Sequence, residues 1–298
     1  MDPQSSPPPR SPASRRRRME AGTDAQPASP LSAKDWSELP LDALSSVFAK
    51  LGAVEVLMGA GLVCHSWLDA AKVPYLWRSV DMSRHKLVEE MDGDVLCAMA
   101  KVAVDRSGGQ LKVFVGKGFV TDELLKYIGD RSPSLKGLGL ISCRGVSNEG
   151  FTEFITKCPL LHDLLLAVCP NIWGRDVYEA TGKACPQLKR FGLRKDLFEW
   201  FLINNTMPIG EALGIAAMRE LRSLRLIETE VTNDELVAVL DSCPHLELLC
   251  LRRCYSISVD GTLREKCAGI KELTFADLVF HQEFDPTDCD RDFDYGSD

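Results

Sequence analysis

The sequence lacks any apolar run long enough to cross a membrane as a helix, which takes about 20 residues. A long uncharged stretch from Val56 to Leu68 is shorter than that and contains His65 and Ser66. The opening residues, MDPQSSPPPR, also lack the apolar segment of a secretory signal. We therefore expect a soluble protein of the nucleus, the cytoplasm or both, without a membrane partner and with its cysteines as reduced thiols.

Motifs for metal binding and catalysis are missing as well. The eleven cysteines are odd in number and include no C-x-x-C pair, which argues against a complete disulfide framework and against the usual zinc arrangements. There is no glycine-rich phosphate loop, no G-x-S-x-G elbow and no H-E-x-x-H, and the five histidines show no recurring relation to a nucleophile. The sequence predicts a non-catalytic protein with no metal and no cofactor.

The acidity of the chain is concentrated at one end. The net charge is −8, and residues 277–298 hold eight acids against Arg291, whereas residues 1–34 hold six basic residues against three acids. Residues 1–33, with seven prolines and the run Arg15 to Arg18, are expected to be a disordered basic tail, and residues 283–298 a disordered acidic tail. A solvated stretch is favoured for the arginine run over a nuclear-import or nucleic-acid patch, and the acidic balance disfavours nucleic acid as a partner.

Between the tails, residues 34–80 are densely apolar with helical periodicity. Leu44, Val47, Phe48 and Leu51 follow the i, i+3, i+4, i+7 pattern, which predicts a helix that stops at Gly52. Residues 54–71 carry two apolar stripes, and a helix that is apolar on two sides must be covered on two sides. A module of about 45 residues is too small to bury this surface by itself. The surplus apolar surface predicts that this module binds a partner.

Large apolar anchors run through this segment in a characteristic order. They read Leu39-Pro40-x-Asp42-x-Leu44, Val47-Phe48-x-x-Leu51, Val63-Cys64-x-x-Trp67 and Leu76-Trp77. This order resembles the F-box, the three-helix module that docks on the adaptor Skp1. The resemblance implies that eight residues build or support the Skp1-facing surface, namely Leu39, Pro40, Leu44, Phe48, Leu51, Val63, Cys64 and Trp67. A small hydrophobic core made of the same residues is the alternative, and some of them are expected to do both.

Beyond this segment a short leucine pattern recurs. Full copies of L-x-x-L-x-L-x-x-C begin at Leu135, Leu161 and Leu246, and partial copies begin at Leu111, Leu188, Leu221 and Ile270. The spacings between these starts are 24, 26, 27, 33, 25 and 24 residues, and all but one lie in the range of leucine-rich repeats. Each repeat is expected to supply one strand and one helix that returns the chain to the next strand.

The segments between the predicted strands carry helix signals. Thr121, Ser147 and Thr232 stand where N-caps are expected, and Thr232 with Glu235 fits a capping box. Cys-Pro pairs mark three helix ends, because proline cannot continue a helix. We interpret the repeat cysteines as buried packing residues rather than reactive thiols. They are Cys143, Cys169 and Cys254 at strand ends and Cys158, Cys185, Cys243 and Cys267 ahead of the next strand.

Together these patterns predict an α/β protein. A three-helix F-box at residues 34–80 precedes a short leucine-rich-repeat solenoid at residues 81–282, with parallel strands on the concave face and helices on the convex face. The repeats resemble the cysteine-containing class that commonly follows an F-box, and the F-box segment is similar to that of plant F-box/leucine-rich-repeat proteins.

Two groups of residues are candidates for binding a target. Arg190, Arg194, Arg225 and Arg252 are expected to gather on neighbouring strands of the concave face, where they suit an acidic or phosphorylated peptide; solvated arginines without a shared task are the alternative. The longest spacing contains Phe198, Trp200 and Phe201, which either anchor a partner or cover the core of the longer repeat. A further hypothesis is that the acidic tail folds over the arginines and competes with targets.

The resemblance implies a function as well. It is that of the substrate-recognition subunit of an SCF-type ubiquitin ligase, in which the F-box binds a Skp1-like adaptor, which connects to cullin and a RING subunit, while the repeats hold a target protein. Two alternatives stay open, a Skp1-associated scaffold without ubiquitination and a Skp1-independent repeat protein with a degenerate F-box.

Overall fold

The computed structural model describes residues 36–196 and 210–276. From Ser37 onward these residues belong to one compact unit. Eight parallel strands form a single sheet in the order β1 to β8, so each strand pairs with the next one along the chain. The strands are β1 (Ser79–Met82), β2 (Val113–Lys117), β3 (Gly137–Ile141), β4 (Asp163–Ala167), β5 (Arg190–Arg194), β6 (Ser223–Ile227), β7 (Leu248–Arg252) and β8 (Glu272–Ala276).

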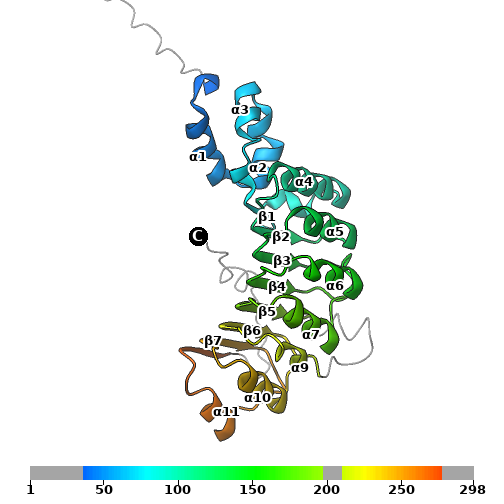
Figure 1. The fold of residues 1–298 in the computed structure, drawn as a ribbon, viewed down its shortest axis with the longest axis vertical. Helices are drawn as coiled ribbons and strands as arrows, with labels where there is room; N and C mark the ends of the chain where they lie inside the picture. The colour runs from blue at the N-terminus through cyan, green and yellow to red at the C-terminus, as the bar shows by residue number, and fades with distance from the viewer. Residues whose placement is uncertain (1–35, 197–209, 277–298) are drawn as a thin grey trace, which may run out of the picture. The chain divides into compact units, whose positions relative to one another are not determined.

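Helices α4 to α7 lie along one side of this sheet (Figure 1), and successive helices from α4 to α11 contact one another. The α-helices are α1 (Leu41–Leu51), α2 (Ala53–Met58), α3 (His65–Ala70), α4 (Gly93–Arg106), α5 (Asp122–Arg131), α6 (Asn148–Thr156), α7 (Arg175–Ala184), α9 (Ala212–Ile215), α10 (Asn233–Ser242) and α11 (Gly261–Lys266). The 3₁₀ helices are η1 (Trp36–Glu38), η2 (Ala60–Leu62), η3 (Pro74–Trp77) and η4 (Lys86–Glu89). The predicted solenoid of strand and helix repeats is confirmed.

Strands β2 to β8 each begin two residues after one of the seven predicted repeat starts. The leucines of the pattern are buried: Leu138 and Leu140, for example, are inaccessible to solvent, while their neighbours Gly137 and Gly139 face the other side of β3. β1 precedes the first predicted start and spans residue 80, where the F-box segment was expected to end. The sheet therefore begins directly after η3.

The predicted N-caps are confirmed. The side chains of Thr121, Ser147 and Thr232 accept hydrogen bonds from backbone N–H groups in the first turns of α5, α6 and α10. At Thr232 the capping box is complete, because the Glu235 carboxylate accepts a return bond from the Thr232 N–H at 2.9 Å. Such caps satisfy backbone groups that the helix leaves unpaired, and each contributes about 1 kcal/mol.

The expectation of one helix apolar on two sides over residues 54–71 is wrong, because the chain folds there into α2, η2 and α3. The breaks have local causes. Gly59 leaves the helical region (φ −134°, ψ −80°), and Cys64 is extended (φ −159°, ψ 176°). At Gly61 the backbone passes so close to α2 that a Cβ atom would lie 2.7 Å from the Val56 carbonyl oxygen. Each stripe is therefore divided among α2, η2 and α3 and does not form a continuous face of one helix.

One continuous hydrophobic core runs from Leu44 in α1 to Cys267 after α11. Trp77 joins the helical segment to the repeats: it is buried, its Nε1 donates to the Ala71 carbonyl at 2.9 Å, and the Arg106 guanidinium of α4 lies 5.3 Å from its ring centre. Part of the surplus apolar surface of the N-terminal module is thus covered by the repeats of the same chain.

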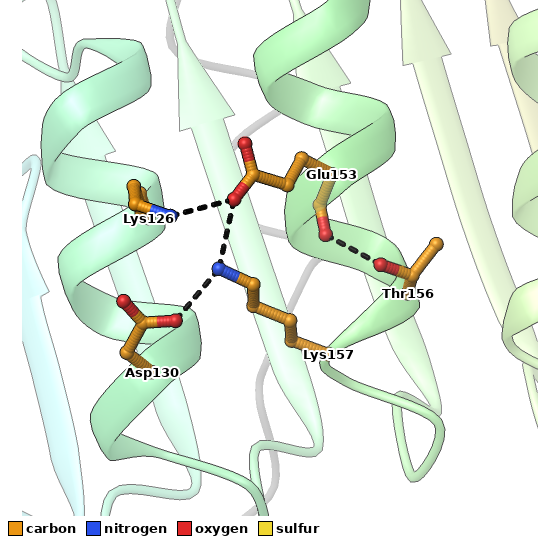
Figure 2. A network of polar contacts seen from close by, with 5 residues as sticks. All are labelled: Lys126, Asp130, Glu153, Thr156 and Lys157. Atoms are coloured by element: carbon orange, nitrogen blue, oxygen red, sulfur yellow. Dashed lines mark hydrogen bonds and ion pairs between the residues drawn. The ribbon is translucent and has the colours of Figure 1, made fainter.

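On the side of the helices that faces away from the sheet, ion pairs link neighbouring helices. Figure 2 shows the ion pairs of Glu153 in α6 with Lys126 of α5 and with Lys157. Its carboxylate lies 2.8 Å from Lys126 Nζ and 2.9 Å from Lys157 Nζ, and Lys157 Nζ also lies 2.6 Å from the Asp130 carboxylate. These bonds lower the pKa of Glu153 to about 2. The network joins α5 to α6 on the side away from the strands.

Candidate protein-binding surfaces

The helical module presents an apolar surface. Leu62 and Val63, in and after η2, are 70% and 61% exposed, and Met58 at the end of α2 is exposed as well. On α1, the apolar stripe divides: Leu44 and Phe48 enter the core, while Val47 and Leu51 remain exposed. Exposed apolar residues that cluster in a short segment are typical of a surface that binds another protein.

The eight residues predicted for this surface fall into three groups. Pro40, Leu51 and Val63 are exposed; Leu39, Cys64 and Trp67 are half-buried; Leu44 and Phe48 are buried. Trp67 of α3 packs edge-on against Phe48 of α1, with ring centroids 5.6 Å apart and an angle of 66° between the rings. Leu44 and Phe48 thus support the surface from below, and the exposed members are the ones that a partner can touch directly.

The four arginines predicted for target binding lie on adjacent strands. Along the register, Arg225 of β6 stands between Gly192 of β5 and Cys250 of β7, and Ile227 stands between Arg194 and Arg252. The structure therefore brings these arginines onto the strand face that the leucines leave, although uncharged residues separate them along each row. Their role toward a target stays a prediction.

Arg190 has a partner that sequence spacing does not reveal. It lies in register with Asp163 of β4, and its guanidinium donates to both carboxylate oxygens, with Nη2 to Oδ2 at 2.8 Å. Such a bidentate pair is a strong interaction and fixes the arginine in place. The other predicted anchors, Phe198, Trp200 and Phe201, lie outside the described residues.

The repeat cysteines are buried, as predicted. Burial raises the pKa of Cys158 and of Cys185 to about 12 and that of Cys243 to about 11. The Cys185 thiol lies 3.5 Å from the Cys158 carbonyl oxygen, and the Cys243 thiol lies 3.4 Å from the Met218 carbonyl oxygen. Among residues 36–196 and 210–276, no group of three or more His, Cys, Asp or Glu is placed to hold a metal ion. In the same ranges no helix combines the length and the apolar character that a membrane span requires.

Comparison with known proteins agrees with this architecture. Residues 36–83 match the family model described as F-box-like. F-box/LRR-repeat protein 22 of Arabidopsis thaliana is 35% identical over 235 residues, which cover 78% of this chain and 74% of the relative. This chain belongs to the F-box/LRR-repeat proteins. F-box/LRR-repeat protein 23 of the same plant is 37% identical over 242 residues, 80% of this chain and 53% of the relative, so the chain spans about half the length of that protein.

A solved structure is also similar to this F-box/LRR-repeat protein. It is a chain in the crystal structure of the Rad7 and Elc1 complex in yeast, with 18% sequence identity, coverage of 68% of this chain and 60% of that chain, and a TM-score of 0.37.

Sequence reasoning missed two features of this F-box/LRR-repeat protein. The first is Leu62, the more exposed neighbour of Val63, which the stripe pattern leaves unassigned because it predicts one helix over residues 54–71. The second is a row of mostly basic residues, each immediately ahead of a strand. A signal for this row was available, since the second position of five of the seven repeats is Lys or Arg.

Proposed function

We propose that this F-box/LRR-repeat protein is the substrate-recognition adaptor of an SCF-type ubiquitin ligase. The F-box surface around Leu62 and Val63 docks on a Skp1-like adaptor, which connects to cullin and a RING subunit, and the repeats hold a target protein. One observation carries the proposal: exposed apolar residues of the F-box sit on helices that share one core with the repeats. A docking surface and a repeat array are thereby parts of one body.

The mechanism is proximity. Transfer of ubiquitin takes place on other chains, and this chain raises the effective concentration of target lysines near the charged conjugating enzyme. Trp77 and Arg106 matter here because they tie the F-box to α4. A rigid junction holds the target at a constant distance and orientation from the adaptor, which a flexible linker does not.

Capture of a Skp1-like adaptor tests the first half of the proposal. The double variant Leu62→Asp with Val63→Asp places two charges on the exposed surface, and we expect it to abolish co-purification while leaving thermal unfolding unchanged. Val102→Asp with Leu160→Asp is the matched control, because it also puts two negative charges on exposed apolar residues, here outside the F-box. Undiminished capture by the double variant would refute docking through this surface.

Target turnover tests the second half. Replacement of the natural chain in cells by the variant with Leu62→Asp and Val63→Asp is expected to raise the abundance of proteins that the repeats capture. If the natural chain binds the adaptor and target levels do not change, the result would instead favour a scaffold that does not direct ubiquitination.

The arginines of the strand face are proposed to contribute to target capture. Reversal of Arg190, Arg225 and Arg252 to Glu is expected to weaken target capture without altering adaptor binding. Because Arg190 is paired with Asp163, the variant Asp163→Asn serves as a companion that removes the charge of this partner and keeps the arginine. Unchanged target capture by the triple variant would remove these arginines from the proposal.

A further inference from the structure

A row of residues crosses the whole sheet at the N-terminal ends of its strands. Each member stands one position ahead of a strand, so the row has one residue for each of the eight strands. We call it the basic row: Arg78, Lys112, Lys136, His162, Lys189, Arg222, Glu247 and Lys271.

Backbone hydrogen bonds hold the basic row in register. The N–H of Lys112 donates to the Arg78 carbonyl at 2.7 Å, that of Lys136 to Lys112 at 2.7 Å, and that of Lys189 to His162 at 2.8 Å. The same bond recurs at every step as far as Lys271. Neighbouring members are therefore one strand spacing apart, about 4.8 Å. Because the backbone groups between the members are engaged with each other, the side chains are what the row offers to a ligand.

The charge of the row is balanced at one end and unbalanced at the other. Glu247 accepts from Arg222 at 2.6 Å and from Lys271 at 2.8 Å, which neutralises much of the positive charge near β7 and β8. In the described part of the chain, by contrast, no ion pair joins Lys112, Lys136 or Lys189 to an acid. The segment from Arg78 to Lys189 thus spans about 19 Å, four strand spacings, with an excess of positive charge.

The row lines a hollow of about 910 Å³ that extends from Tyr75 in η3 of the F-box to Glu272 at the start of β8. Asp163 is the acid of the hollow nearest to the lysines in register, and its carboxylate is engaged by Arg190. An incoming carboxylate therefore meets lysines rather than a free acid. The hollow provides room for a chain to lie along the row.

We propose that the basic row from Arg78 to Lys189 binds an extended acidic segment of the target protein. This inference rests on the proposed function for the identity of the partner, and it adds the chemistry of the recognised segment. An extended chain rises about 3.3 Å per residue, so about six residues cover the 19 Å of the row. Acids on alternate residues are about 7 Å apart, which is between one and two strand spacings, so successive acids reach different members of the row.

The same observations favour a peptide over a nucleic acid. Single-stranded nucleic acid is bound by cationic grooves that also provide aromatic side chains for stacking. Among the described residues that line the hollow, Tyr75 is the only Phe, Tyr or Trp.

Fluorescence anisotropy with the purified full-length chain tests the proposal. The probe is a labelled peptide of eight glutamates, and a peptide of eight glutamines is the uncharged control. The variant with Lys112, Lys136 and Lys189 changed to Gln is expected to bind the glutamate probe at least about tenfold more weakly, on the scale of three exposed ion pairs. The control variant changes Lys126, Lys183 and Lys266 to Gln, which removes the same charge from the helices and is expected to bind normally.

Three results would overturn the proposal. One is equal loss of binding in both triple variants, because the effect would then come from net charge alone. The second is tighter binding of an eight-nucleotide oligothymidylate than of the glutamate peptide. The third is that the glutamate peptide binds neither the natural chain nor a variant in which the seven acids of residues 283–298 are changed to amides. That variant is included because it removes any competition from the acidic residues of the chain itself.

Capture of a Skp1-like adaptor is measured on the same variants. Peptide binding without adaptor capture would refute the proposed function and leave the row as an acidic-peptide site. Adaptor capture without peptide binding would refute only the proposal that the basic row binds an acidic segment.

Discussion

Lys195 and Glu211 form an ion pair inside the protein core. The distance from Nζ to Oε1 is 2.9 Å, and the side chains are only 4% and 8% exposed. The same Glu211 oxygen accepts the Gly174 N–H at 2.7 Å, so the carboxylate also supports the chain ahead of α7. Burial lowers the pKa of Lys195, while the carboxylate beside it opposes that effect.

Removal of one member of this pair is expected to be costly. Glu211→Ala leaves a buried ammonium group without its carboxylate, and we expect a loss of about 3 to 5 kcal/mol in the free energy of unfolding measured with urea. The double variant Lys195→Met with Glu211→Leu removes both charges and should recover much of that loss. Glu179→Ala breaks the exposed pair with Lys183 and should change stability far less. Equal losses for Glu211→Ala and Glu179→Ala would contradict the buried role.

Phe48 and Val47 distinguish a residue that supports the F-box core from one that is exposed to a partner. Phe48 is buried against Trp67, so Phe48→Ala is expected to cost about 3 to 5 kcal/mol of stability through lost burial and a cavity. Val47→Ala, at the exposed neighbouring position, should change stability by less than about 0.5 kcal/mol. Thermal unfolding of both variants checks this expectation, and a stable Phe48→Ala protein would show that the α1–α3 contact is dispensable.

Glu153 predicts a pH dependence in the acid range. Its folded pKa is about 2 against an ordinary 4.5, because Lys126 and Lys157 bind the carboxylate. A lowered folded pKa means that its contribution is fully present above pH 4.5 and is lost as the pH falls toward 2. Glu153→Gln should therefore flatten the decline of stability across this window and leave its shape near neutral pH unchanged. Urea unfolding at a series of pH values measures the slope, and parallel curves for the two proteins would contradict the assignment.

The buried cysteines predict slow thiol chemistry in the folded protein. With the pKa of Cys158 and Cys185 raised to about 12 by burial, neither thiol forms appreciable thiolate at pH 8. We expect both to react with a thiol reagent only after denaturation, whereas the half-buried Cys64 is expected to react sooner. Peptide mapping of the labelled sites after timed exposure distinguishes them. Rapid native labelling of Cys158 or Cys185 would contradict the packing role.

The raised pKa values of these thiols also predict a loss of stability at high pH. A thiol whose folded pKa exceeds the ordinary 9.0 contributes stability that is complete below pH 9 and declines as the pH rises toward 12, because the unfolded chain loses the proton first. Cys158→Ala is expected to weaken this alkaline decline. An alkaline unfolding curve with the same slope in both proteins would contradict it.

Much of the fold was predictable because it depends on local and periodic signals. The recurrence of leucines located every strand from β2 to β8, and short polar motifs located the caps of α5, α6 and α10. These signals are reliable because strand alternation and helix capping involve residues a few positions apart. The break of residues 54–71 into three short helices was missed, because the close approach of Gly61 to Val56 depends on how the turns pack.

The sequence by itself determined the class of fold, the order of its strands and which residues of each repeat enter the core, since a regular repeat leaves each strand only one neighbour on each side. Only the tertiary structure decided which side chains pair at long range. Arg190 meets Asp163 of the preceding repeat from 27 positions away, and Lys195 meets Glu211 from the other end of the longest repeat, so neither pair appears in a local pattern. Tertiary structure also decided which apolar residues of the F-box remain exposed, because burial depends on what the α4 helix and the first strand cover.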